Sequence, residues 1–243
     1  MHEEPHVSDQ TAATVAAPAE DERLELKPFF LAAALWLPLS FFVWFMLRSA
    51  VVYPVIRMVE AVLTSWMPEL VARVGQTYHA MDVDLLAQLG AVPGLPGGVL
   101  EVTTQINVLP YCYSIPVLMG LSIATPISWA RTGFQLALGI PILFVVQAFG
   151  VMGDVLKRIA FDLSGLVHGG LAEQGYSAVA GIAAQNAQDA ALAALQGHGL
   201  TPAILGVWFQ FGYLILPPIS AVVLWILFNR RFIEALRLQP RPA

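Results

Sequence analysis

Charged residues are scarce in this chain, and cysteine is nearly absent. Charged side chains make up 12% of the 243 residues, against roughly 25% in a soluble domain, whereas 57% of the residues are hydrophobic. The formal net charge of −5 argues against a nucleic-acid-binding surface. The single cysteine, Cys112, excludes an internal disulfide and a metal site built from several cysteines. The composition therefore predicts an integral membrane protein without a bound cofactor.

The hydrophobic residues gather into four long segments, at about 29–47, 111–129, 133–152 and 201–228. A helix of about 20 residues crosses the hydrocarbon core of a bilayer, so we predict a mainly α, polytopic membrane protein with about four transmembrane helices. Arg131 separates the second segment from the third and is expected in a short turn. Pro217 and Pro218 are expected to kink the last segment.

These segments define the domain organisation. Residues 28–235 are predicted to form a single membrane domain. The preceding residues 1–27 are acidic and lack apolar periodicity, as is typical of a disordered tail. Residues 236–243 are expected to form a short cytoplasmic tail.

Two longer polar segments, 48–110 and 153–199, separate the spans. Helical apolar spacing from residue 50 to residue 78 predicts one or two interfacial helices, broken near Met67-Pro68. Strict alternation from Leu100 to Val108 predicts a strand, with residues 81–85 as its hairpin partner. The open edge of this β-ribbon cannot face lipid, so the ribbon must lie outside the hydrocarbon. The alanine-rich run 178–195 is expected to form a surface helix.

The distribution of basic residues predicts the orientation. If both termini are cytoplasmic, seven Lys and Arg residues lie inside and five lie outside, which agrees with the positive-inside rule. The inside set is Arg23, Lys27, Arg131, Arg230, Arg231, Arg237 and Arg241; the outside set is Arg48, Arg57, Arg73, Lys157 and Arg158. Segments 48–110 and 153–199 then share the outer face of the membrane.

Cys112 is the candidate nucleophile. It lies at the outer end of the second span, where Arg158, His168 and His198 are expected at the same face of the membrane. A thiolate needs a neighbouring base or cation, and these residues supply both types. The alternative is a small buried thiol packed within a helix, the common environment of a lone cysteine. The spacing of the histidines and aspartates does not favour a metal site.

Other polar residues favour structural roles. Asp154 and Arg158 are four residues apart, which allows an ion pair on one helical face. Gln147, inside a span, is expected to form an interhelical hydrogen bond. All four spans lack the intramembrane charges that mark an ion path, so the sequence gives little support to the hypothesis of a transporter.

Three stretches together resemble the exosortase H-associated membrane proteins. They are the opening apolar run from Phe30 to Phe41, the polar β-run that leads into Leu109-Pro110-Tyr111-Cys112-Tyr113, and the exit from Phe149 to Lys157. The resemblance covers most of the chain after residue 27. It implies a bacterial inner-membrane protein found alongside exosortases, which are membrane enzymes that cleave and sort proteins carrying a C-terminal signal.

The resemblance implies an accessory role, in which the outer face binds the exosortase or its sorted substrate protein. Exosortases themselves use a Cys, an Arg and a His. Here Cys112 is followed by Tyr113-Ser114 instead of Ser-Gly, and Arg158 lacks the Asn-x-x-Arg context. The alternative hypothesis is a Cys-dependent, exosortase-like transpeptidase or protease that uses Cys112 with Arg158 and either His168 or His198. A structural envelope protein without a sorting role is a third hypothesis.

Overall fold

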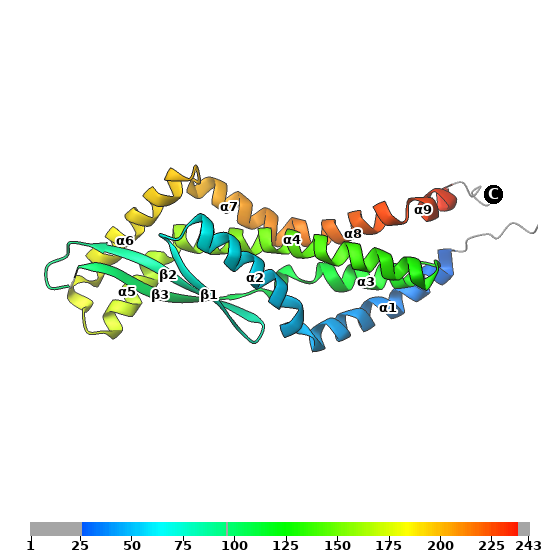
Figure 1. The fold of residues 1–243 in the computed structure, drawn as a ribbon, viewed down its shortest axis with the longest axis horizontal. Helices are drawn as coiled ribbons and strands as arrows, with labels where there is room; N and C mark the ends of the chain where they lie inside the picture. The colour runs from blue at the N-terminus through cyan, green and yellow to red at the C-terminus, as the bar shows by residue number, and fades with distance from the viewer. Residues whose placement is uncertain (1–25, 96, 238–243) are drawn as a thin grey trace, which may run out of the picture.

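The computed structural model describes residues 26–95 and 97–237, and the predicted disordered tail lies almost wholly outside this range. The molecule is elongated (Figure 1). Helices α1 (Leu26–Met46), α3 (Ser114–Ala124) and α8 (Leu216–Phe228) lie at one end. The sheet, α5 (Leu163–Glu173) and α6 (Ser177–Gly197) form a cap at the other end. Helix α4 (Trp129–Phe161) runs through both parts.

Three helical stretches in the described part of the chain are long and apolar enough to cross a membrane: Lys27–Met46, Trp129–Phe161 and Pro202–Phe228. The predicted span at 111–129 instead contains a shorter apolar helix, Leu109–Ala124, formed by the 3₁₀ turn η1 (Leu109–Tyr111) and α3. Helix α3 ends before Pro126 because the residue preceding a proline is driven out of helical geometry. Thr125 is accordingly extended, with ψ of 129°.

Arg131 is not a turn residue, contrary to the prediction. It lies in the first turn of α4 and donates a hydrogen bond to the carbonyl oxygen of Phe228 at 3.3 Å. The 33 residues of α4 extend for about 50 Å at 1.5 Å per residue, roughly 20 Å more than the hydrocarbon core requires. This extra length carries the C-terminal part of α4 into the cap.

The last apolar stretch changes helix type before its paired prolines. It consists of α7 (Pro202–Gln210), the π-helix η2 (Phe211–Ile215) and α8, followed by α9 (Arg230–Arg237). Proline lacks an N–H and its ring meets the carbonyl four residues earlier, which for Pro217 belongs to Tyr213. The wider turn of a π-helix makes room for the proline ring. The kink expected at the two prolines therefore takes the form of a π-helix over Phe211–Ile215.

The cap contains a three-stranded antiparallel sheet in the order β1 (Val71–Thr77), β2 (Ala80–Gly90) and β3 (Gly98–Asn107). The predicted ribbon is confirmed, since β2 pairs with β3 in a register that includes Met81 opposite Ile106. Alternate residues of β3 face inward, as the sequence pattern predicts: Leu100 and Val102 are half-buried, and Thr104 and Ile106 are buried.

Strand β1 corrects the prediction of a second interfacial helix after Met67-Pro68. Helix α2 (Arg48–Trp66) ends where expected, but the chain then enters the sheet. A register shift between Val71 and Arg73 places buried Val71 and Val74 three residues apart. A β-bulge thus gives this strand the apolar spacing of a helix.

The two predicted outer segments pack into one unit. A single apolar core joins α2, the sheet, α5, α6 and the distal half of α4. Helix α6 packs against β2 and α5 through a buried face of small side chains: Ala180, Ala183, Ala184, Ala187 and Ala191.

Gln188 of α6 closes the sharp corner between α4 and α5. Its amide donates to the carbonyl oxygens of Ile159 and Ala160 at 3.0 and 2.9 Å, and its side-chain oxygen accepts from the Ser164 N–H at 3.0 Å. One side chain therefore satisfies backbone groups at the end of one helix and the start of the next.

Candidate functional site at the junction of the membrane helices and the cap

Cys112 lies immediately after η1, at the boundary between the cap and α3. Its side chain is completely buried in the apolar core. Within residues 26–95 and 97–237, no side chain forms a hydrogen bond with the thiol. An apolar environment opposes formation of the thiolate. In this structure Cys112 has the surroundings of a packed core residue.

Arg158 occupies the distal part of α4. Its Nε lies 3.4 Å from Asp154 Oδ1 and its Nη1 lies 3.4 Å from Thr104 Oγ1. The ion pair that the spacing of Asp154 and Arg158 allows is therefore present, and through Thr104 it reaches across to β3. The Arg158 side chain is 30% exposed, whereas that of Asp154 is only 10% exposed.

The two histidines take separate positions in the cap. His168 is exposed on α5. His198 follows α6 and its Nε2 lies 2.9 Å from Glu69 Oε1, with its ring edge-on to Trp66 at 5.8 Å between centroids. The hydrogen bond with His198 lowers the pKa of the Glu69 carboxyl. Neither histidine forms a hydrogen bond with Cys112 or Arg158 in the described part of the chain.

A set of neighbouring polar and aromatic side chains extends from Arg158 to the π-helix, and we call it the junction cluster: Thr104, Tyr111, Asp154, Arg158 and Tyr213. Tyr111 is 1% exposed, and its hydroxyl has no hydrogen-bond partner among the described residues. This hydroxyl lies near the Asp154 carboxylate, outside hydrogen-bond geometry. Tyr213, from the π-helix, meets the Tyr111 ring edge-on at 5.4 Å.

The junction cluster continues to the surface through Lys157 and Phe209. The Tyr213 ring stacks on Phe209 at 5.6 Å, and Lys157 Nζ lies 5.4 Å from the centre of the Phe209 ring. Lys157 also pairs with Asp162 at 3.1 Å. The cluster thus presents basic, acidic and aromatic groups at the end of the membrane helices, which suits recognition of a polypeptide near the bilayer surface.

Close backbone contact fixes this junction. A Cβ on Gly150 would lie 2.9 Å from the carbonyl oxygen of Gly212 and 3.0 Å from Tyr111 Cδ1. Absence of side chains at Gly150 and Gly212 therefore lets α4 and η2 touch through their backbones. One turn away, Trp208 stacks on Phe149 at 4.7 Å and donates its indole N–H to the Phe149 carbonyl at 3.0 Å.

A second polar surface lies on the outer face of the sheet. Asp84 is 5% exposed although it belongs to this face, because Thr103 Oγ1 donates to it at 2.7 Å and Arg73 Nε at 2.9 Å. The hydrogen bond from Thr103 and the paired Arg73 guanidinium together hold the pKa of Asp84 below its usual value, against the effect of burial.

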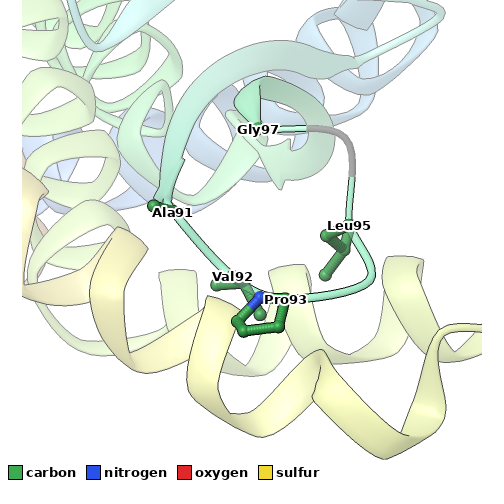
Figure 2. A pocket seen from close by; sticks show the side chains of 5 residues that line it. All are labelled: Ala91, Val92, Pro93, Leu95 and Gly97. Carbon is green, nitrogen blue, oxygen red and sulfur yellow. The ribbon is translucent and has the colours of Figure 1, made fainter.

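One shallow pocket of about 380 Å³ lies under the loop between β2 and β3 (Figure 2). It is lined by Ala91, Val92, Pro93, Leu95 and Gly97. These residues carry no acid, base or nucleophile, so the pocket offers no catalytic group. In residues 26–95 and 97–237, no three His, Cys, Asp or Glu side chains are grouped to hold a metal ion.

Sequence reasoning identified Arg158 and Asp154 but missed Tyr111, Thr104 and Tyr213 as their neighbours. Tyr111 adjoins Cys112 in the sequence. A tyrosine at the start of an apolar helix was the signal that could have indicated it as part of the site. The sequence held no such signal for Tyr213, because only the π-helix and the close contact of Gly212 with Gly150 bring its ring to Tyr111.

The fold and the junction cluster define a helical integral membrane protein with a compact extramembrane cap. A family model described as exosortase H-associated membrane protein matches residues 23–183 and 175–232. The chain belongs to this family, as its resemblance in sequence implied. No curated protein and no solved structure matches the chain.

Proposed function

We propose that this protein is a non-catalytic accessory component of exosortase-dependent protein sorting, whose cap and junction cluster bind the exosortase or its substrate protein. Membership of the exosortase H-associated family supports the link to the exosortase system. The binding role rests on the junction cluster, where the partly exposed Arg158 and the exposed Tyr213 lie at the ends of the membrane helices.

The observation that most favours binding over catalysis is the environment of Cys112. Its thiol is fully buried, and among the residues that the structure describes no base or cation forms a hydrogen bond or ion pair with it. A cysteine nucleophile requires such a partner together with access to substrate. The predicted general bases, His168 and His198, make other contacts or face solvent.

The test is complementation in the native host. The gene is deleted, and processing of sorted substrate proteins is followed by the change in their electrophoretic mobility. Wild-type protein and the Cys112→Ala variant are then restored at equal levels. The accessory role predicts that deletion impairs processing and that both proteins restore it. Loss of processing with Cys112→Ala at normal protein level would instead support the Cys-dependent transpeptidase or protease.

Matched variants of the junction cluster separate binding from membrane assembly. Arg158→Gln removes the cation at the cluster, and Arg57→Gln removes an exposed cation on α2, outside the cluster. The proposal predicts a larger loss of processing for Arg158→Gln, with both proteins present in the membrane. If deletion of the gene leaves all substrate processing unchanged, the protein has no sorting role.

A further inference from the structure

The turn between β1 and β2 places a tyrosine in an unfavourable backbone conformation. Tyr78 has φ of +57°, the one positive φ among the described non-glycine residues. Thr77 pairs with Ala80, so the loop has two residues, and Tyr78 is the first of them. Two-residue hairpin loops favour glycine or asparagine where φ is positive, and a bulky residue there is strained. A tyrosine at this position is therefore explained better by its side chain than by the turn.

The Tyr78 side chain makes little use of the protein itself. It is 81% exposed, the largest exposure among the large hydrophobic and aromatic residues that the structure describes. Neighbouring Gln76 holds the turn in place, because its amide donates to the Tyr78 carbonyl at 2.6 Å and to the Ser49 carbonyl at 3.0 Å. The tip of the hairpin is thus fixed while its aromatic ring points away.

Ser49 locates this tip relative to the membrane. Helix α1 is one of the membrane-spanning candidates and ends at Met46, three residues before Ser49. Figure 1 shows the β1–β2 turn beside the corner between α1 and α2. The turn therefore lies at the level where α1 leaves the bilayer.

The surface around this corner has the composition of a membrane interface. Phe45, Met46 and Leu47 are about half exposed, and the Arg48 guanidinium lies over the Phe45 ring at 4.7 Å. Tyrosine is enriched at the boundary between hydrocarbon and headgroups, where its ring is buried in lipid and its hydroxyl stays hydrated. Basic residues near helix ends reach toward headgroups in the same region.

We propose that the β1–β2 turn is a lipid-binding anchor, in which Tyr78 inserts into the headgroup region and holds the sheet against the membrane surface. The occupant is the bilayer itself, since the turn is continuous with the outer end of α1. This anchor adds an attachment of the cap that is separate from its chain connections to the membrane helices through α2, η1, α4 and α7. It goes beyond binding of an exosortase or substrate and does not depend on it.

Site-directed spin labelling tests this proposal with the full chain. Because Cys112 is the single cysteine, a Cys112→Ala background carries one label at a chosen position. Tyr78→Cys is compared with Val99→Cys, which lies in the same sheet on β3 and is 60% exposed. Each labelled protein is placed in nanodiscs of phosphatidylethanolamine and phosphatidylglycerol. Collision rates with oxygen and with a water-soluble nickel chelate are then measured.

The proposal predicts an oxygen-to-nickel collision ratio several-fold higher at position 78 than at position 99. Equal ratios would place the turn in water and overturn it. Protection of position 78 from both reagents would indicate a protein contact and would also overturn it.

Hydroxyl-radical footprinting of the unaltered chain in the same nanodiscs avoids any effect of substitution. Phe161, at the cap end of α4, is 50% exposed and serves as the solvent-accessible reference. Tyr78 should be oxidised at a rate several-fold below that of Phe161, after correction for intrinsic reactivity. Oxidation of Tyr78 at the Phe161 rate would contradict insertion.

Discussion

The contact between Gly150 and Gly212 makes a sharp prediction about the junction. An alanine at position 150 would place its Cβ 2.9 Å from the Gly212 carbonyl oxygen, whereas ordinary contacts begin at 3.4 Å. The obstructing atom is backbone, so α4 and η2 must separate by about 0.5 Å. Overpacking of this kind typically costs about 1–3 kcal/mol. We expect Gly150→Ala to destabilise the protein by about 2 kcal/mol.

The matched control is Gly133→Ala on the same helix, because a Cβ at Gly133 meets no atom within 4 Å. Alanine is the better helix former by about 0.5–1 kcal/mol, so this variant should be neutral or slightly stabilised. Thermal unfolding in one mild detergent, followed by circular dichroism, measures both. Equal melting temperatures for the two variants would refute the proposed backbone contact between α4 and η2.

Three further predictions concern buried polar groups. Gln147 donates to Ser114 Oγ at 2.7 Å between α4 and α3, so a double-mutant cycle with Gln147→Leu and Ser114→Ala should give a coupling of about 1 kcal/mol; zero coupling would count against this bond. Gln188→Leu leaves three backbone groups unpaired and should cost about 3 kcal/mol in thermal unfolding, whereas exposed Gln185→Leu on the same helix should change little. The folded-state pKa of Asp84 is lowered, so its contribution to stability is present above pH ~4 and is lost as pH falls through the folded-state pKa. When the free energy of unfolding is measured from pH 7 to pH 3, the Asp84→Asn variant should therefore lose less stability than the unaltered protein. Parallel plots of stability against pH for the two proteins would contradict this role.

Long periodic features of the sequence predicted the architecture well. The apolar runs marked α1 and the two other long stretches, and the alternation from Leu100 to Val108 marked β3. Spacing allowed the ion pair of Asp154 and Arg158, and the position of Gln147 inside a span predicted its interhelical hydrogen bond, although not that Ser114 is the partner. Apart from the Gln147 bond, which joins residues 33 positions apart, these features depend on contacts near in sequence or on hydrophobicity.

The features that could not be predicted from the sequence depend on tertiary contacts. The bulge in β1 changed the spacing of Val71 and Val74 to a helical one. The role of Gln188 depends on a helix corner more than 20 residues away, and Tyr213 reaches the junction cluster only through the π-helix. Composition also overestimated the span at 111–129, because hydrophobicity there continues past the end of α3.

The central claim is that the protein binds a component of the exosortase system, and co-purification tests it most directly. The tagged chain and its Arg158→Gln variant are extracted in parallel from native membranes in mild detergent, with Arg57→Gln as the matched control, and the bound proteins are identified by mass spectrometry. The account predicts enrichment of an exosortase or of a sorted substrate protein with the unaltered chain, and less with the Arg158→Gln variant. Recovery of the unaltered chain without either would contradict the account.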